Sequence, residues 1–250
     1  MDWTTRKATT PMSSSTLPTA VLVHGAFADA SGFNGVIREL SSTGHTVAAP
    51  PNPLRSLAFD AATIASYVSA IEGPALLVGH SYGGAVITEA SATLNNVTGL
   101  VYLAAFGLDV GESCASIQQP FAASLLSSTS YPTAYDAPGA PQGPDLYIGR
   151  EEFRETFCAD VPVDTAEVMF ATQRPLSLAA LTENATAAGW KTIPSWFLVC
   201  EYDNAISPDC ERFMAERMRA TTRSIAGSHT AFVAQPVPVA DFISEALSAA

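Results

Sequence analysis

Charge is scarce in this chain of 250 residues, and positive charge is scarcest. Only 14% of the residues are charged, and 24 acidic side chains stand against 12 Lys and Arg, for a formal net charge of −12 at pH 7. No basic run interrupts this acidic balance, which argues against a nucleic-acid-binding protein and against a protein that binds anionic membranes. Because 48% of the residues are hydrophobic, the composition predicts a folded domain with a large buried core.

Long apolar segments and cysteines are scarce as well. No stretch approaches the ~20 apolar residues of a membrane-spanning helix, and the N-terminal segment lacks the apolar centre of a secretory signal, so the expected compartment is the cytoplasm. The four cysteines are not spaced as metal ligands, and we expect no bound metal. They are buried thiols, or two of them pair as Cys200–Cys210 or Cys114–Cys158.

Residues 1–19 hold nine Ser or Thr and few large apolar side chains, and predict a disordered tail. From residue 20, short apolar runs alternate with helical patterns. The expected strands are Ala20–Val23, Thr46–Ala49, Ala75–Val78, Val97–Ala104, Trp196–Cys200 and Thr222–Ile225. The expected helices begin at Ser31, Asp60, Ser81, Pro208 and Val237. This alternation predicts an α/β fold with a parallel sheet of six strands.

The alternation stops between residues 107 and 189. This segment has no continuous apolar strand, and a long loop is marked by Pro132, Pro138, Gly139, Pro141, Gly143 and Pro144. Short helical patterns cover Glu151–Phe157, Asp164–Gln173 and Ser177–Ala187. We therefore expect 107–189 to be a helical insertion over the sheet, with 20–106 and 190–250 forming the core.

The segment Gly79-His80-Ser81-Tyr82-Gly83 matches G-x-S-x-G between an expected strand and an expected helix. In that context the motif is typical of a nucleophile elbow, a tight turn that strains the serine backbone and leaves no room for side chains at Gly79 and Gly83. Ser81 is then the expected nucleophile, at a helix N-terminus that favours developing negative charge. The alternative is a tight turn with an inert serine.

A serine nucleophile needs a base, and in this architecture the chain order is serine, acid, histidine. Of the four histidines, His229 follows the last expected strand, at the carboxyl edge where α/β sites are built. Asp203, just after the preceding strand, is the first choice for the acid. Glu201 is the reserve, and Asp109, after the fourth strand, is a further alternative.

The oxyanion of acyl transfer needs preorganised N–H donors. The expected donors are the backbone N–H groups of Tyr82 and of Ala26, in the turn after the first strand. The expected lining of a mainly apolar substrate pocket is Gly25, Phe27, Phe106 and Phe121, with Tyr131 and Tyr135 as further aromatic candidates in the insertion. Ordinary packing between insertion and core explains any single aromatic residue equally well.

The segments VLVHGAF, GHSYGG, LVYLAAF and the late GSH resemble an α/β-hydrolase. More narrowly, they resemble the branch that holds plant methyl-ester esterases, hydroxynitrile lyases and their bacterial relatives. The resemblance covers residues 20–250 and is weak in the insertion, which in this family forms the cap that shapes the substrate pocket. It implies a Ser81–His229–Asp203 triad, no cofactor, and an active site between core and cap.

Two positions separate the activities within this branch. The lyases that this chain resembles carry threonine where it has Gly25, and lysine where it has Thr230. That departure favours hydrolysis of a carboxylic ester, a lactone or a thioester of a small, mainly apolar molecule through an acyl-enzyme on Ser81. A hydroxynitrile-lyase-like C–C lyase and a non-catalytic small-molecule receptor on the same fold are the alternatives.

Overall fold

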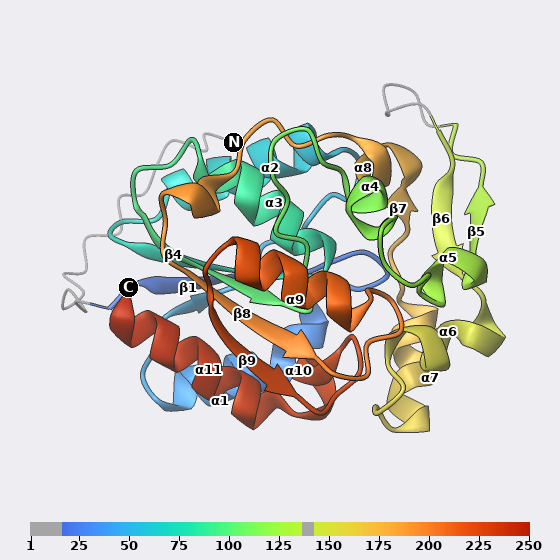
Figure 1. Ribbon diagram of the computed structural model, residues 1–250. Helices are drawn as coiled ribbons and strands as arrows, with labels where there is room; N and C mark the ends of the chain where they lie inside the picture. The colour runs from blue at the N-terminus through green and yellow to red at the C-terminus, as the bar shows by residue number, and fades with distance from the viewer. Residues whose placement is uncertain (1–16, 137–142) are drawn as a thin grey trace, which may run out of the picture.

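A parallel sheet of six strands forms the centre of the molecule (Figure 1). The computed structural model describes residues 17–136 and 143–250, and the strand order in its sheet is β2-β1-β3-β4-β8-β9. The strands are β1 Thr19–Val23, β2 Val47–Ala48, β3 Ala75–His80, β4 Val97–Leu103, β8 Ser195–Cys200 and β9 Thr221–Ile225. All their pairings are parallel, which confirms the predicted α/β fold class.

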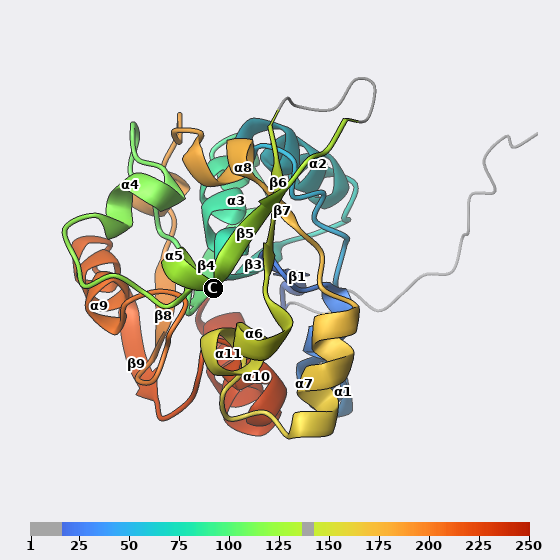
Figure 2. The same ribbon diagram turned by 90° about the vertical axis from the view of Figure 1, so that its right-hand side faces the viewer.

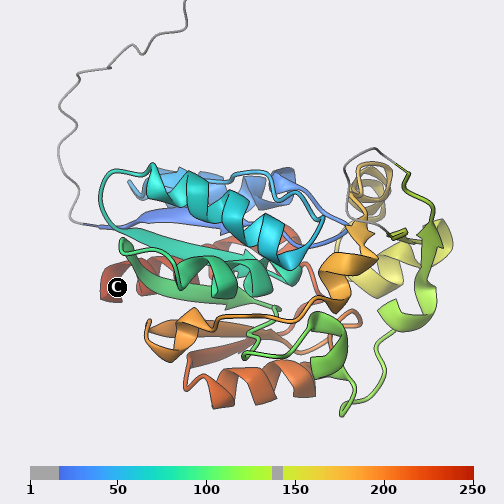
Figure 3. The same ribbon diagram turned by 90° about the horizontal axis from the view of Figure 1, so that it is seen from above.

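Helices cover both faces of this sheet (Figure 3). In β3, Leu77 packs on one face, and Leu76 and Val78 pack on the other. The first face carries α2 Leu57–Ser69, α3 Tyr82–Ser91 and α9 Pro208–Arg217, and the second carries α1 Asn34–Ser42, α10 Ala231–Ala234 and α11 Pro236–Ala249. Burial on both faces explains why the strands read as continuous apolar runs in the sequence.

Two helices begin elsewhere than expected. Asp29 caps the first helical segment, a 3-10 turn over Ala30–Phe33 that leads into α1, and Ser31 donates its N–H to the Asp29 carboxylate. Ser56 caps α2 through the Phe59 N–H, which leaves Asp60 inside the helix. In both cases two side chains able to cap lie within a few residues, and the one with extended backbone takes the role.

The segment 107–189, called the cap segment below, lies over the carboxyl ends of the strands (Figure 2). It contains the expected helices as α6 Arg150–Phe157, α7 Val163–Ala171 and a shorter α8 Leu178–Thr182, together with α4 Cys114–Gln118 and α5 Leu126–Thr129. It also holds an antiparallel sheet that the sequence pattern did not predict, with strands β5 Ser130–Thr133, β6 Asp145–Ile148 and β7 Leu176–Ser177. Each of these strands has at most four residues, which is too short to leave a clear period-2 signal.

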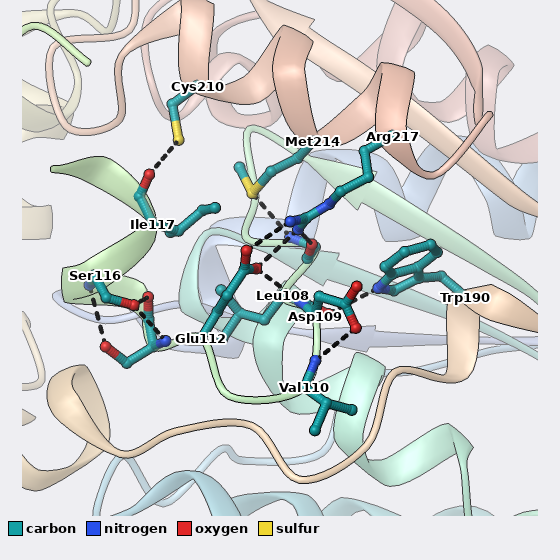
Figure 4. A network of polar contacts seen from close by, with 12 residues as sticks. Leu108, Asp109, Val110, Glu112, Ser116, Ile117, Trp190, Cys210, Met214 and Arg217 are labelled. Carbon is teal, nitrogen blue, oxygen red and sulfur yellow. Dashed lines mark hydrogen bonds and ion pairs between the residues drawn. The ribbon is translucent and has the colours of Figure 1, made fainter. Parts of the chain in front are cut away.

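Both ends of the cap segment are fastened to the core (Figure 4). Arg217 of α9 forms an ion pair with Glu112 at 2.6 Å and donates to the Gly107 carbonyl at 2.9 Å. On the returning chain, the Trp190 Nε1–H donates to the Leu108 carbonyl at 2.7 Å. These contacts fix the points where the chain leaves and rejoins the α/β core.

All four cysteines are buried free thiols, which is the first of the two readings that the sequence allowed, and neither alternative pairing forms. Within the described ranges, no helix is long and apolar enough to cross a membrane. Most of the expected tail, residues 1–16, and the loop residues Pro138, Gly139 and Pro141 lie outside those ranges.

Candidate active site

Ser81 occupies the sharp turn between β3 and α3. Its φ of 53° lies in the left-handed region, which is strained for any residue with a side chain. The surrounding backbone holds this geometry: the Ser81 carbonyl accepts the N–H groups of Gly84 at 2.9 Å and Phe106 at 3.1 Å. The Ser81 N–H in turn donates to the Leu103 carbonyl at 3.3 Å. The turn therefore presents the serine at the carboxyl edge of the sheet in one fixed orientation.

At two positions of the motif only glycine fits, because a side chain would clash with neighbouring backbone atoms. A Cβ at Gly79 would lie 2.6 Å from the Gly83 carbonyl oxygen, and a Cβ at Gly83 would lie 2.2 Å from the Val23 carbonyl oxygen. Real Cβ atoms do not approach oxygen so closely. The motif predicts this absence of room, because helix α3 starts directly against β1 and β3.

His229 and Asp203 form a buried pair at the same edge. Their atoms Nδ1 and Oδ2 are 2.5 Å apart, and the two side chains are 1% and 0% exposed. The second Asp203 oxygen, Oδ1, accepts the N–H groups of Ala205 at 2.6 Å and Ile206 at 2.8 Å. A neutral His229 therefore carries its proton on Nδ1, where Asp203 accepts it, and Nε2 is left as an acceptor.

The atoms that we expect to react are unengaged. The His229 ring packs against the ring of His80, the residue before Ser81, with centroids 4.6 Å apart. Among the described residues, neither Ser81 Oγ nor His229 Nε2 has a hydrogen-bond partner, and the two atoms are not hydrogen-bonded to each other. Catalytic hydrogen bonds are often long in a ligand-free site and shorten when substrate binds.

The two alternative acids lie away from His229. Asp109 forms an ion pair with Lys191 and accepts the Val110 N–H at 2.7 Å, beside the fastening of the cap segment (Figure 4). Glu201 forms an ion pair with Arg212 of α9. Of the three carboxylates considered from the sequence, the structure brings only Asp203 to the histidine.

The turn after β1 is held by His24. Its Nδ1–H donates to the Gly25 carbonyl at 2.9 Å, and its Nε2 accepts the Asn52 N–H at 3.0 Å. Burial lowers the pKa of His24 to about 4, so the ring is neutral and serves as a structural tie. In the part of the chain that the structure describes, the N–H groups of Ala26 and Tyr82 have no acceptor, as donors for an oxyanion require.

A polar network lies behind Tyr82. Its phenol donates to Asp60 Oδ2 at 2.8 Å, and the backbone N–H of Arg55 donates to the same carboxyl at 3.0 Å. The Arg55 guanidinium in turn forms an ion pair with Asp145 of β6 at 2.9 Å. Burial raises the pKa of Asp60 to about 6. This network joins the residue after Ser81 to the small sheet of the cap segment.

The loop that carries His229 is held on both sides by the cap segment. Asp160, between α6 and α7, accepts the N–H of Ser228 at 3.0 Å and also its hydroxyl. The Thr230 hydroxyl donates to the Phe157 carbonyl at 3.3 Å. The His229 carbonyl accepts the Nε2–H of His80 at 2.9 Å, and burial and the neighbouring His229 lower the pKa of His80 well below its usual value. No local pattern marks Asp160, because its partner Ser228 lies 68 residues further along the chain.

A cavity of about 330 Å³ opens beside this site, between the turn after β1 and the cap segment. Of the expected pocket residues, Phe27 and Phe121 line it. Gly25 does not line it, because this residue faces Ser81, where an added Cβ would lie 2.6 Å from the serine Cβ. Phe106 is absent as well, since it is buried in the core. The full lining is Phe27, Ala115, Gln118, Gln119, Phe121, Ala122, Ala123, Ser124, Leu126, Ser127, Ser130, Leu146, Leu176 and Leu181.

Ser81 does not line the cavity itself, and Phe27 is the link between the two. Phe27 belongs to the turn that brings Gly25 against Ser81, and its N–H donates to the Arg174 carbonyl of the cap segment at 2.8 Å. The remaining aromatic candidates lie outside: Tyr131 is 48% exposed and stacks on Tyr147, and Tyr135 is 38% exposed beneath Arg55.

Fold and site together define a class of protein. The sequence matches the model of the alpha/beta hydrolase family over residues 20–242, and the chain belongs to that family. This membership confirms the resemblance that the sequence motifs indicated.

The relatives include a methylesterase and a fungal alpha/beta hydrolase. Over 145 residues the chain is 26% identical to Methylesterase 2 of Arabidopsis thaliana, covering 56% of this chain and 55% of that protein, so the alignment spans about half of the relative. It is also 26% identical over 212 residues to the alpha/beta hydrolase nvfD of Aspergillus novofumigatus (77% and 80% covered).

Solved structures share the whole fold. Polyneuridine aldehyde esterase superposes with a TM-score of 0.80 at 19% identity, covering 92% of this chain and 99% of that one. A pyrethroid hydrolase from Sphingobium faniae JZ-2 superposes with a TM-score of 0.77 at 20% identity, covering 93% and 98%. At such identities the likeness shows a common fold, and function must be argued from the site.

Proposed function

We propose that this chain hydrolyses a carboxylic ester through an acyl-enzyme on Ser81. One observation carries the proposal: the buried His229–Asp203 pair engages Nδ1 of the imidazole and leaves Nε2 unengaged at the edge where Ser81 is presented. The two N–H groups without acceptors, on Ala26 and Tyr82, supply the donors that a tetrahedral oxyanion needs.

The steps follow from this geometry. His229 Nε2 accepts the hydroxyl proton while Ser81 Oγ attacks the ester carbonyl, and the carbonyl oxygen becomes an oxyanion held by the two N–H groups. The imidazolium then returns its proton to the leaving alcohol, and the acyl group remains on Ser81. A water molecule, deprotonated by the same nitrogen, attacks the acyl carbon, and the imidazolium returns the proton to Ser81 Oγ as the acid is released. Asp203 orients the ring and stabilises its charged form throughout.

The cavity indicates the class of ester. Its volume of about 330 Å³ is at the lower end of the roughly 300–1,000 Å³ of small-molecule pockets. None of the described residues that line it is ionisable, so it suits an uncharged, mainly apolar acyl or alcohol group. Methyl esters and pyrethroid-like esters, named for the relatives, therefore belong in a first panel, with lactones and thioesters beside them.

The position after His229 favours hydrolysis over cyanohydrin cleavage. Thr230 is uncharged and fully buried, and its hydroxyl is bound to the Phe157 carbonyl. It offers no positive charge to a cyanide leaving group.

We also propose a cytoplasmic location, which the four unpaired thiols suit, since free cysteines are usual in reducing compartments.

The test combines a fluorophosphonate probe with turnover of the ester panel. We expect labelling at Ser81, release of more than one equivalent of product, and a loss of roughly 10³-fold or more in kcat for Ser81→Ala. Ser69→Ala, at an exposed serine of α2, is the matched control and should label and turn over normally. A folded Ser81→Ala protein that kept most of its rate would exclude the serine mechanism, and binding of esters without any turnover would indicate the receptor alternative.

A further inference from the structure

Glu211 is a carboxyl group buried directly behind the proposed triad. It lies on α9, is 0% exposed, and accepts the Cys200 N–H on Oε2 at 3.1 Å. Its other oxygen, Oε1, has no N–H or hydroxyl donor among the described residues. The charged group that acts most strongly on this carboxyl is the side chain of Asp203. The mechanism given above assigns no role to this second acid.

Two carboxyl groups can hydrogen-bond to each other only if one of them carries a proton, because two carboxylates offer acceptors alone. Asp203 has the environment of an ionised group, since it is bound by the Ala205 and Ile206 N–H groups and by His229. Glu211 has one N–H donor and no exposed surface, which disfavours its charged form. Burial and the neighbouring Asp203 raise the pKa of Glu211 well above its usual value. The proton that a hydrogen bond between the two carboxyl groups requires is therefore on Glu211 and not on Asp203.

We propose that Glu211 is a positioning residue that remains a neutral carboxylic acid and donates a hydrogen bond to the Asp203 carboxylate, holding it against His229. The donated bond adds to the three that Asp203 receives from Ala205, Ile206 and His229. Its effect on rate rests on the proposed ester hydrolysis, whereas the protonation of Glu211 rests on the buried pair alone.

Arg212 is the one cation among the described residues that favours the charged form of Glu211, and its effect is smaller than those of burial and of Asp203. Arg212, the next residue on α9, is 45% exposed and pairs with Glu201 and Asp209. The thiols of Cys200 and Cys210 lie nearby, and burial raises the pKa of each, so both stay neutral. An ionised Glu211 would stand beside an ionised Asp203 with no buried cation to offset the pair.

The protonation of Glu211 is tested by thermal and urea unfolding of the wild type and of Glu211→Gln between pH 5 and 8, which needs no substrate. An unfolded glutamate is ionised above about pH 4.3, so the folded wild type binds one more proton than its unfolded chain. The unfolding constant of the wild type, relative to that of Glu211→Gln, should rise by up to about tenfold per pH unit. Glu216→Gln, at an exposed position of the same helix, is the control, and its unfolding constant should change with pH as that of the wild type does. If the unfolding constant of Glu211→Gln changed with pH in the same way as that of the wild type, Glu211 would be ionised in the folded protein and the proposal would be overturned.

The positioning role is tested by kinetics on the best ester. Glutamine keeps an N–H donor toward Asp203, so Glu211→Gln should retain kcat within about threefold and hold its rate to higher pH than the wild type. Leucine keeps the volume but has no donor, so Glu211→Leu should lose on the order of tenfold in kcat with little change in KM. If glutamine failed as badly as leucine, a neutral donor would not be what the site needs. If Glu211→Leu does not fold, the comparison of Glu211→Gln with the wild type still tests whether a neutral donor at position 211 supports the rate. If no ester is turned over at all, the unfolding result stands on its own.

Discussion

The close approach of Gly25 to Ser81 gives a prediction whose size follows from distances. The Cβ of an alanine at position 25 would lie 2.6 Å from Ser81 Cβ, 2.8 Å from the His80 carbonyl oxygen and 3.2 Å from His80 Nδ1. Non-bonded carbon atoms pack at about 3.5–4.0 Å, so the turn or the serine must move by about 1 Å. Misplacing a reacting group by about 1 Å costs on the order of 10²-fold in rate, which is about 2.7 kcal/mol in the activation barrier.

We therefore expect Gly25→Ala to lower kcat about 10²-fold with a smaller change in KM, and Gly25→Thr to lose at least as much. The assay is initial-rate kinetics on the best ester of the panel, with circular dichroism and Tm to confirm folding. Gly73→Ala is the control: its φ of +96° strains an added side chain, but nothing lies within 4 Å of the new Cβ. It should lower Tm and leave kcat within about twofold. A folded Gly25→Ala protein with kcat within about threefold of the wild type would refute the reasoning, because the turn would then yield without displacing the serine.

Three further predictions concern the acid, the pH dependence of stability and metals. Asp203→Asn should cost on the order of 10²–10⁴ in kcat, with Asp109→Asn and Glu201→Gln each within about tenfold of wild type; steady-state kinetics on the three variants would contradict this if the ranking were reversed. Burial raises the pKa of Asp60 from 3.8 to about 6, so the folded protein retains a proton there that the unfolded chain has lost, and stability falls as the pH rises through that window. Asp60→Asn should remove this part of the fall, and Tm series from pH 4 to 7 with the same slope for both proteins would argue against it. EDTA should leave the rate unchanged, and inhibition by EDTA that zinc reverses would point to a metal mechanism.

The sheet and its edge were predictable because their signals are local. A strand buried on both faces must be apolar throughout, and β3 is buried along its whole length. The G-x-S-x-G motif depends on steric contacts between residues close in the chain, such as Gly79 and Gly83. Asp203 and His229 could be paired in advance because β8 and β9 are adjacent parallel strands that end at one edge.

The features that the sequence left hidden depend on contacts between distant segments. Asp160 is an ordinary loop aspartate until the fold brings it to Ser228. Glu211 sits on a helix among other acidic residues, and nothing in the local pattern shows that it is turned inward against Asp203. The small sheet of the cap segment is stabilised by pairing between strands far apart in sequence, β6 with β7, and not by the propensity of any one strand.

The attachment of the His229 loop to Asp160 and Phe157 has a consequence for engineering new specificity. Exchanging the cap between related hydrolases is one way to reshape a substrate pocket. In this protein, however, one part of the cap segment lines the cavity and another part supports the His229 loop. Residues 115–130 supply most of the cavity wall and can be recombined or diversified. The stretch from 157 to 160 fastens the loop that carries His229 and should stay with its own core. A chimera whose crossovers fall before α6 keeps that support, whereas one that also replaces α6 and the turn after it would change the pocket and release the His229 loop together.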